Sequence, residues 1–145
     1  MSSGSYIVPA RSRADIEALA VTVRTTLGLQ EQAYFPIIAV IEPVLSRLLP
    51  DYVFRVGEIA EMGRAEGHTS PDGTYIELRE DVYEKACYGD GRARFTAAHE
   101  LGHLVMHTNI VLMRAPEGQK TPAYCDSEWQ ANLFAAAILM PDRFF

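Results

Sequence analysis

Three residues, His99, Glu100 and His103, have the types and spacing of a metal site on a helix. Residues four apart lie on the same helix face, so the two histidines can direct imidazole nitrogens at one metal ion. Glu100 lies about 100° around the helix from His99, where its carboxylate can take a proton from a water molecule beside the ion. Two nitrogen ligands with an adjacent base predict a metal-dependent hydrolase.

The C-terminal part of the chain offers candidates for a third ligand. A catalytic zinc ion usually has three protein ligands and an open position for water. Glu128 and Asn132 are four residues apart, which suits one ligand and one residue that accepts the free N–H of a ligand histidine, here His99. Cys125 lies close by, but thiolate is an uncommon ligand in a mixed catalytic site. We therefore predict Glu128 as the third ligand and Asn132 as the partner of His99.

The remaining histidines fit a ligand role less well. His107 follows His99 by eight residues and lies about 80° away from it around the helix. We expect His107 to be a packed residue, a neighbour of a metal ligand or a donor to the substrate. His68 is expected to be an ordinary strand or surface histidine. Three other side chains are candidates to stabilise an oxyanion, and the sequence does not rank them: Tyr75, Tyr124 and Arg94.

The elements that must position these residues predict an α+β fold. Apolar residues recur every three to four positions in four segments, which predicts helices over residues 12–28, 36–49, 93–108 and 126–139. Pro43 should kink or split the second helix. The expected core face of the third helix, opposite the two histidines, consists of Ala97, Leu101, Leu104 and Val105.

Residues 51–55 and 74–79 read as strands, with a further short strand ending near Thr69. Ser70-Pro71-Asp72-Gly73 is a strong turn signal before the last strand. We expect a small twisted antiparallel or mixed sheet of about three strands, packed with four to five helices. Residues 1–12 are expected to be a flexible lead-in. Residues 109–125 are expected to be a long irregular connection.

Composition restricts the classes of function. The 145 residues, 48% hydrophobic and 22% charged, suit a single domain over residues 1–145. The net charge is −6 and the 13 Lys and Arg residues are scattered, which disfavours direct nucleic-acid binding. Cys87 and Cys125 form no disulfide framework. No apolar run reaches the length of a membrane span, and the N-terminus lacks the pattern of a signal peptide. We expect a cytoplasmic protein without membrane partners.

Two paired motifs resemble those of the ImmA/IrrE metallopeptidases. They are Arg94-Phe95-Thr96-Ala97-Ala98-His99-Glu100-Leu101-Gly102-His103 and Glu128-x-x-Ala131-Asn132-x-Phe134-Ala135-Ala136-x-Ile138-Leu139-Met140-Pro141. The resemblance covers roughly residues 50–142. It implies a gluzincin-like core in which His99, His103 and Glu128 bind zinc and Glu100 is the general base. Gln130 stands where the family often has a second Glu.

The same resemblance implies limited proteolysis of a helix-turn-helix transcriptional repressor or antitoxin, in phage, mobile-element, toxin–antitoxin or stress regulation. The alternative is a zinc-stabilised regulatory protein or toxin that binds its partner without cutting it. Two histidines and a carboxylate also suit Mn²⁺ or Fe²⁺, which we expect less than Zn²⁺. An extended peptide substrate could dock as an added strand along residues 74–79.

Overall fold

Three strands form a mixed sheet in the computed structural model, which describes residues 6–110, 113–114 and 121–141. The strand order is β2 (Val53–Gly57), β4 (Tyr75–Arg79), β3 (Gly67–Thr69). Strand β2 is parallel to β4 and β3 is antiparallel to it, which confirms the α+β class and the mixed sheet. Because β4 has a neighbour on each side, it has no free edge, and the predicted peptide docking along residues 74–79 is wrong.

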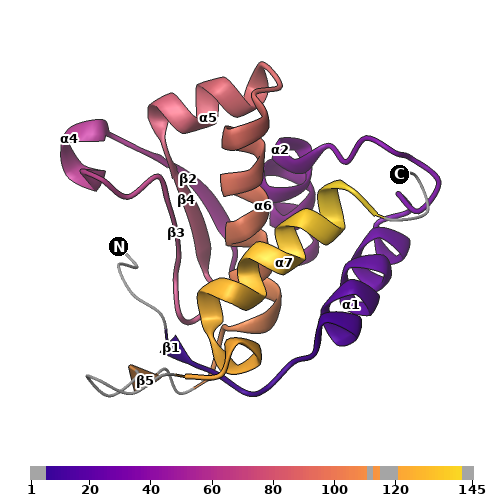
Figure 1. The fold of residues 1–145 in the computed structure, drawn as a ribbon. Coiled ribbons are helices and arrows are strands. Elements are labelled where there is room, and N and C mark those ends of the chain that lie inside the picture. The colour runs from indigo at the N-terminus through magenta and orange to yellow at the C-terminus, as the bar shows by residue number, and fades with distance from the viewer. Residues whose placement is uncertain (1–5, 111–112, 115–120, 142–145) are drawn as a thin grey trace.

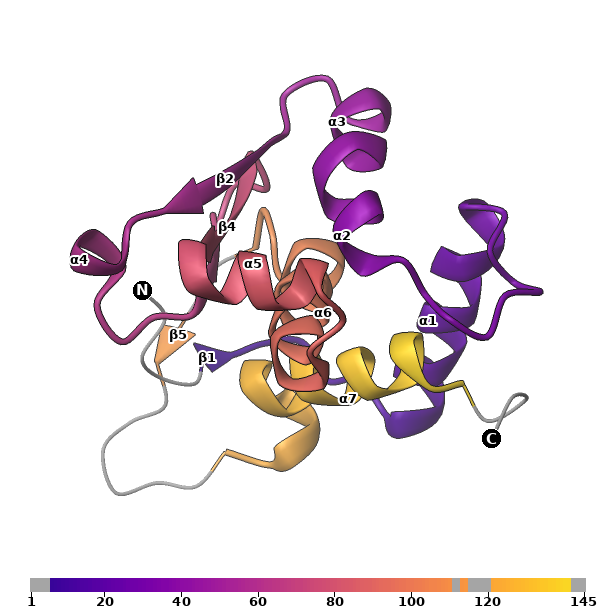
Figure 2. The same ribbon diagram turned by 90° about the horizontal axis from the view of Figure 1, so that it is seen from above.

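Helix α6 (Gly91–Met106), which carries the histidine motif, lies at the centre of the molecule. Asp90 caps its first turn by accepting a hydrogen bond from the Ala93 amide at 2.9 Å. In Figure 1, α6 stands between the strands and α1 (Arg13–Thr26), and α7 (Ser127–Leu139) crosses it. The view from above in Figure 2 shows the same order. Helix α5 (Glu80–Cys87) joins β4 to α6.

The predicted N-terminal helices are confirmed. Ser12 caps α1 through a capping box with Asp15, and Gly28 follows its end with φ of +73°. The second helix is divided into α2 (Ile37–Ala39), a π-helical turn η1 (Val40–Val44) and α3 (Leu45–Leu48). Pro43 lies inside the π turn because its ring removes one amide donor and crowds the preceding turn.

The core lies where α6 meets the sheet on one side and α7 on the other. Its fully buried side chains include Ile76 and Leu78 of β4, Leu101 of α6, and Phe134 and Ile138 of α7. Val105, which the helical pattern assigned to this core, is 37% exposed and lies at its margin. Within the described residues, none of the helices combines the length and the apolar composition that a membrane span needs.

Several short elements lie outside these predictions. Helix α4 (Ile59–Met62) separates β2 from β3, and a 3₁₀ turn η2 (Ala123–Cys125) precedes α7. Strand β1 (Tyr6–Ile7) pairs with β5 (Met113–Arg114), and the next residue, Val8, is only 4% exposed. Residues 6–8 are therefore part of the fold, contrary to the predicted flexible lead-in. Residues 1–5 lie outside the described part of the chain.

Candidate metal centre

The crossing of α6 and α7 brings His99, His103 and Glu128 together. The Nε2 atoms of the two histidines are 3.0 Å apart. Glu128 Oε1 lies 3.1 Å from His99 Nε2, and Glu128 Oε2 lies 3.0 Å from His103 Nε2. The three residues form a group whose candidate ligand atoms all lie within 4.8 Å of one another. One residue from the first turn of α7 thus faces two from the middle of α6.

The far nitrogen of each histidine ring has its own partner. His99 Nδ1 lies 2.8 Å from Asn132 Oδ1, and His103 Nδ1 lies 2.9 Å from His107 Nδ1. An amide oxygen can only accept, so His99 Nδ1 donates its proton to Asn132. In the neutral ring, this leaves a bare lone pair on His99 Nε2, directed at His103 and Glu128.

The arrangement fits a divalent cation. Imidazole lone pairs and carboxylate oxygens are electron-pair donors, and their convergence is unfavourable unless a proton or a cation lies among them. Glu128 Oε2 is buried, and apart from its contact with His103 it has no hydrogen-bond partner among the residues that the structure describes. A tetrahedral ion with bonds of 2.0–2.1 Å separates its ligand atoms by about 3.3 to 3.4 Å, close to the separations observed. The residues present therefore suit a metal ion.

The charges of the group favour the same conclusion. Burial lowers the pKa of His99, but the Glu128 and Glu100 carboxylates outweigh it, and the pKa lies above its ordinary value. Burial alone would raise the pKa of Glu128, yet the adjacent His103 and His99 side chains lower it to about 2. Glu128 is thus a carboxylate over the whole physiological pH range, as a metal ligand must be.

Glu100 lies beside this group and is held by strand β3. It is only 7% exposed. The Thr69 hydroxyl lies 2.7 Å from Glu100 Oε1 and 2.9 Å from the Glu100 backbone oxygen. A Cβ atom at Gly67 would come within 2.9 Å of Glu100 Cγ, so the close approach of β3 to α6 requires glycine at this position. The carboxylate is therefore fixed beside the candidate ligands.

Glu100 and His103 share a cavity of about 100 Å³ with residues of β3 and the turn that follows it. His68 lines this cavity, and its buried Nδ1 has no hydrogen-bond partner within the described part of the chain. His68 is on a strand, as expected, but it faces the candidate site. Sequence reasoning missed the link of Thr69 and His68 to this site, because no pattern shows which strand lies beside α6. The one available signal was the small residue Gly67 two positions before Thr69.

The three candidate oxyanion donors lie away from the cavity lining. Arg94 stacks on the Tyr34 ring at 4.1 Å, and Arg55 stacks on the Tyr75 ring at the same distance. Tyr124 is 50% exposed on η2. Cys125 is not part of the metal-binding group found among the described residues.

His107 lies at the end of α6, 5% exposed, between His103 and Gln130. Burial lowers its pKa to about 4, although the hydrogen bond that His107 donates to Gln130 acts in the opposite direction. It is therefore neutral at physiological pH. Its contact with His103 makes it a neighbour of a candidate ligand, which is one of the three roles expected from the sequence.

Comparison with known protein families gives one match to this chain. A family model described as the IrrE N-terminal-like domain, a group of M78 peptidases, matches residues 60–145. The match contains all of β3, β4, α6 and α7, and therefore every residue of the candidate site. Comparisons with curated proteins and with solved structures gave no significant match.

Proposed function

The chain belongs to the IrrE N-terminal-like family of M78 peptidases, and on this premise we propose that it is a zinc-dependent endopeptidase. Its metal ligands are His99, His103 and Glu128, and Glu100 is its general base. The proposal rests on the convergence of three candidate ligand atoms from two helices, next to a buried carboxylate that lines the same cavity as one of them, His103. Asn132 orients His99 through its Nδ1–H group.

In this proposal each residue has a defined part in peptide hydrolysis. When bound, zinc supplies Lewis acidity that polarises the scissile carbonyl and acidifies a water molecule. Glu100 takes a proton from the attacking water and delivers it to the leaving amine. The Thr69 hydroxyl keeps the Glu100 carboxylate turned toward the cavity. His68, which also lines the cavity, offers a ring nitrogen to the substrate.

The substrate peptide docks along β3 rather than β4. Hydrogen bonds from the Arg79 amide to Glu66 and from the Ser70 amide to Tyr75 fix the antiparallel register. Because hydrogen-bonded positions alternate in such a ladder, Gly67 and Thr69 direct their backbone groups at the outer edge of the sheet. An extended peptide that pairs with this edge runs past Glu100. A structure of a peptide complex tests this placement.

The partner we propose is a helix-turn-helix repressor or antitoxin, which the enzyme cuts at a limited number of bonds. The support is family membership and charge: the chain carries a net charge of −6, which favours encounter with a basic DNA-binding protein. Direct binding of this chain to DNA is disfavoured for the same reason. Regulation of transcription or of a toxin then follows from removal of the partner.

The test compares the wild-type chain with Glu100→Gln, which keeps the shape of the side chain but removes the base. Both proteins are loaded with Zn²⁺, their metal content is measured by elemental analysis, and each is incubated with the helix-turn-helix protein encoded beside its gene. We expect equal zinc content. Cleavage by the wild type should be lost or reduced at least about 100-fold in the variant.

Each alternative gives a distinct result. A wild-type chain that binds zinc and the partner but cuts nothing would support a zinc-stabilised binding protein and overturn the peptidase. Equal cleavage by both proteins would remove Glu100 from the mechanism. Metal content measured on protein purified without added metal distinguishes Zn²⁺ from Mn²⁺ and Fe²⁺.

A further inference from the structure

A line of buried hydrogen bonds runs from His103 away from the metal group and ends on two backbone carbonyls. It passes from His103 Nδ1 to His107 Nδ1 at 2.9 Å, and from His107 Nε2 to Gln130 Oε1 at 2.7 Å. We infer that His107 and Gln130 are positioning residues, which hold His103 in the tautomer that directs a bare Nε2 at the metal ion. This inference rests on the proposed metal centre.

The direction of every hydrogen bond in this line follows from its buried end. The Gln130 side-chain nitrogen lies 3.0 Å from the Pro9 carbonyl oxygen and 2.7 Å from the Tyr124 carbonyl oxygen. Carbonyl oxygens only accept, so the Gln130 amide must present its NH₂ group to both of them. Its oxygen is therefore turned to His107. A flipped amide would lose both hydrogen bonds at a residue with 0% exposure.

The two histidine tautomers follow in turn. Because Gln130 Oε1 is an acceptor, His107 Nε2 carries the proton of its ring. His107 Nδ1 then has a lone pair, so the proton between the two rings belongs to His103 Nδ1. A neutral His103 ring has no second proton, and its Nε2 is left bare toward Glu128 and His99. The opposite tautomer of His103 would place a proton where the metal ion binds.

This arrangement differs from that of the other histidine ligand. His99 uses Asn132, an exposed residue on the surface of α7. His103 instead uses a second imidazole, that of His107, whose orientation is set by Gln130 on the buried face of α7. The line also connects the metal group to the backbone carbonyls of residues 9 and 124, so the N-terminal segment helps to fix the orientation of Gln130. Loss of a hydrogen-bond partner that orients a metal-binding histidine lowers metal affinity by about 10- to 100-fold.

The test begins with nitrogen NMR of the full-length wild-type chain, both metal-free and loaded with Zn²⁺. We expect His107 to carry its proton on Nε2 in both forms and the zinc-loaded His103 to carry its proton on Nδ1. We also expect a nitrogen–nitrogen coupling between the two Nδ1 atoms across their hydrogen bond. A His107 ring protonated on Nδ1, or a free exchange between tautomers, would overturn the inference, and this measurement needs no variant.

The second part measures zinc affinity by competition with a chelating dye. Gln130→Leu removes the acceptor and should raise the Kd for Zn²⁺ about 10- to 100-fold, with loss of the His107 tautomer preference. His107→Gln keeps an acceptor for His103 and should retain most of the affinity. Gln32→Leu, the same change at an exposed residue, is the matched control and should bind as the wild type does.

These readouts separate this inference from the proposed function. Wild-type affinity and tautomers in Gln130→Leu would overturn the positioning role while leaving the metal centre intact. The expected tautomers in a wild-type chain that binds no Zn²⁺ would support the hydrogen-bond line and overturn the peptidase.

Discussion

The position of Glu100 depends on single atoms of its neighbours. Its carboxylate accepts from one hydroxyl, that of Thr69, and its side chain passes over a glycine at which a Cβ atom would collide. The hydrogen bonds of the Thr69 side chain go to Glu100 and not to the three candidate ligands, so the base and the metal group can be perturbed separately. This independence makes the general base testable without loss of the metal.

We predict that Thr69→Val lowers peptidase turnover about 10- to 100-fold, because the carboxylate loses the donor that aligns it with the cavity. Valine is nearly isosteric with threonine, so packing should be retained. Zinc affinity should be unchanged. Steady-state kinetics and dye competition measure the two quantities.

Thr69→Ser is the matched control, since it restores the hydroxyl and should recover most of the turnover. A Thr69→Val enzyme with wild-type turnover would show that the hydroxyl does not align the base. An equal loss in both variants would show that turnover depends on the exact packing at residue 69 and not on the hydroxyl alone, because serine keeps the hydroxyl and lacks only the methyl group.

At the scale of elements, the metal group depends on how closely α6 and α7 approach. Gly102 lies one residue before the candidate ligand His103, and a Cβ atom there would lie 3.1 Å from Phe134 Cδ1 on α7. Phe134 is fully buried. The absence of a side chain at Gly102 therefore sets the distance at which Glu128 reaches the two histidines.

We predict that Gly102→Val destabilises the fold by about 1–3 kcal/mol, the usual range for overpacking of a core, and also weakens zinc binding because the helices separate. Urea unfolding and dye competition measure the two effects. The double variant with Phe134→Leu makes room for the added methyl groups and should recover part of both losses. A double variant that is worse by the full sum of the two single changes would contradict this coupling.

The junction between the sheet and α5 carries a pH-dependent contact. Arg79, the last residue of β4, donates to Asp81 Oδ1 at 2.6 Å and to Asp81 Oδ2 at 3.0 Å. It also donates to the Gly63 carbonyl after α4 at 2.8 Å. The hydrogen bond with Arg79 holds the pKa of Asp81 below its ordinary value of 3.8. The contact thus stabilises the folded chain only while Asp81 is ionised.

We predict that Asp81→Asn is less stable than the wild type at pH 7 and that the difference disappears in acid. A carboxyl whose pKa is lower in the folded state stabilises the fold above 3.8, and this contribution is lost as the pH falls through the folded-state pKa. Urea midpoints measured from neutral pH down to below that value follow the change. In an Arg79→Gln background the pH dependence of the Asp81→Asn effect should vanish, and its persistence would assign it to other groups.

At the scale of the whole molecule, the sequence predicted the elements that depend on local patterns but not the contacts between residues far apart in the chain. The helix that carries His99 and the helix that carries Glu128 are visible in the sequence, because apolar spacing and polar caps are local properties. The contact of β3 with Glu100 joins residues 31 positions apart. The pairing of Gln130 with Pro9 joins residues 121 positions apart. No periodic pattern encodes such contacts, so Thr69, His68 and the N-terminal segment were not assigned to the site.

The error over peptide docking has the same origin. Alternation in residues 74–79 correctly predicts a strand, but the order of strands in the sheet depends on which strands pair. The parallel pairing of β2 with β4 places β4 in the middle. It leaves β3, only three residues long and weak in pattern, as the edge strand nearest α6.

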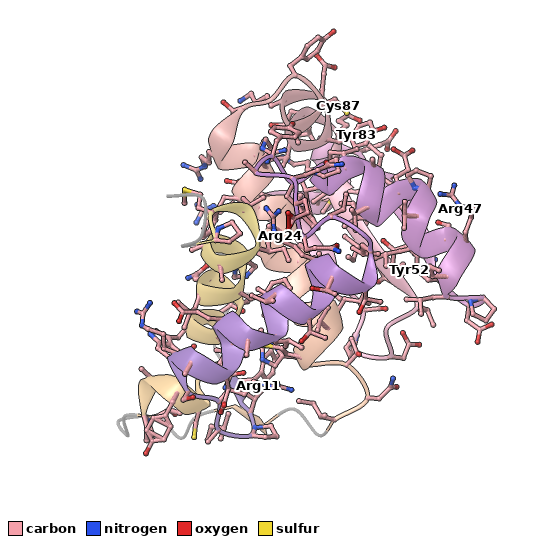
Figure 3. The ribbon with its side chains drawn as sticks, turned by 90° about the vertical axis from the view of Figure 1, so that its right-hand side faces the viewer. Arg11, Arg24, Arg47, Tyr52, Tyr83 and Cys87 are labelled. Carbon is pink, nitrogen blue, oxygen red and sulfur yellow. The ribbon has the colours of Figure 1, made fainter. Side chains whose placement is uncertain are left out.

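One buried arginine joins the N-terminal helix, the connection after it and the end of α7. Arg24 Nε donates to the Ile138 carbonyl at 2.9 Å, and its terminal nitrogens donate to the carbonyls of Leu29, Gln32 and Ala33. Its guanidinium also lies 5.1 Å from the centre of the Phe35 ring. Figure 3 views the molecule from the side on which α1 lies and labels Arg24. The residue is 3% exposed.

We predict that Arg24→Met destabilises the fold by at least about 3 kcal/mol, because it leaves the buried Ile138 carbonyl and three partly buried carbonyls without this donor. Arg24→Lys keeps the charge but not the planar guanidinium, so its stability should lie between those of the wild type and Arg24→Met. Ile138 is ten residues from Glu128, about 15 Å along the helix, so the metal group should remain intact. Saturating Zn²⁺ should then increase the free energy of unfolding, measured with urea, by the same amount in Arg24→Met and in the wild type. A smaller increase in Arg24→Met would show that the hydrogen bonds of Arg24 at the far end of α7 also shape the metal group.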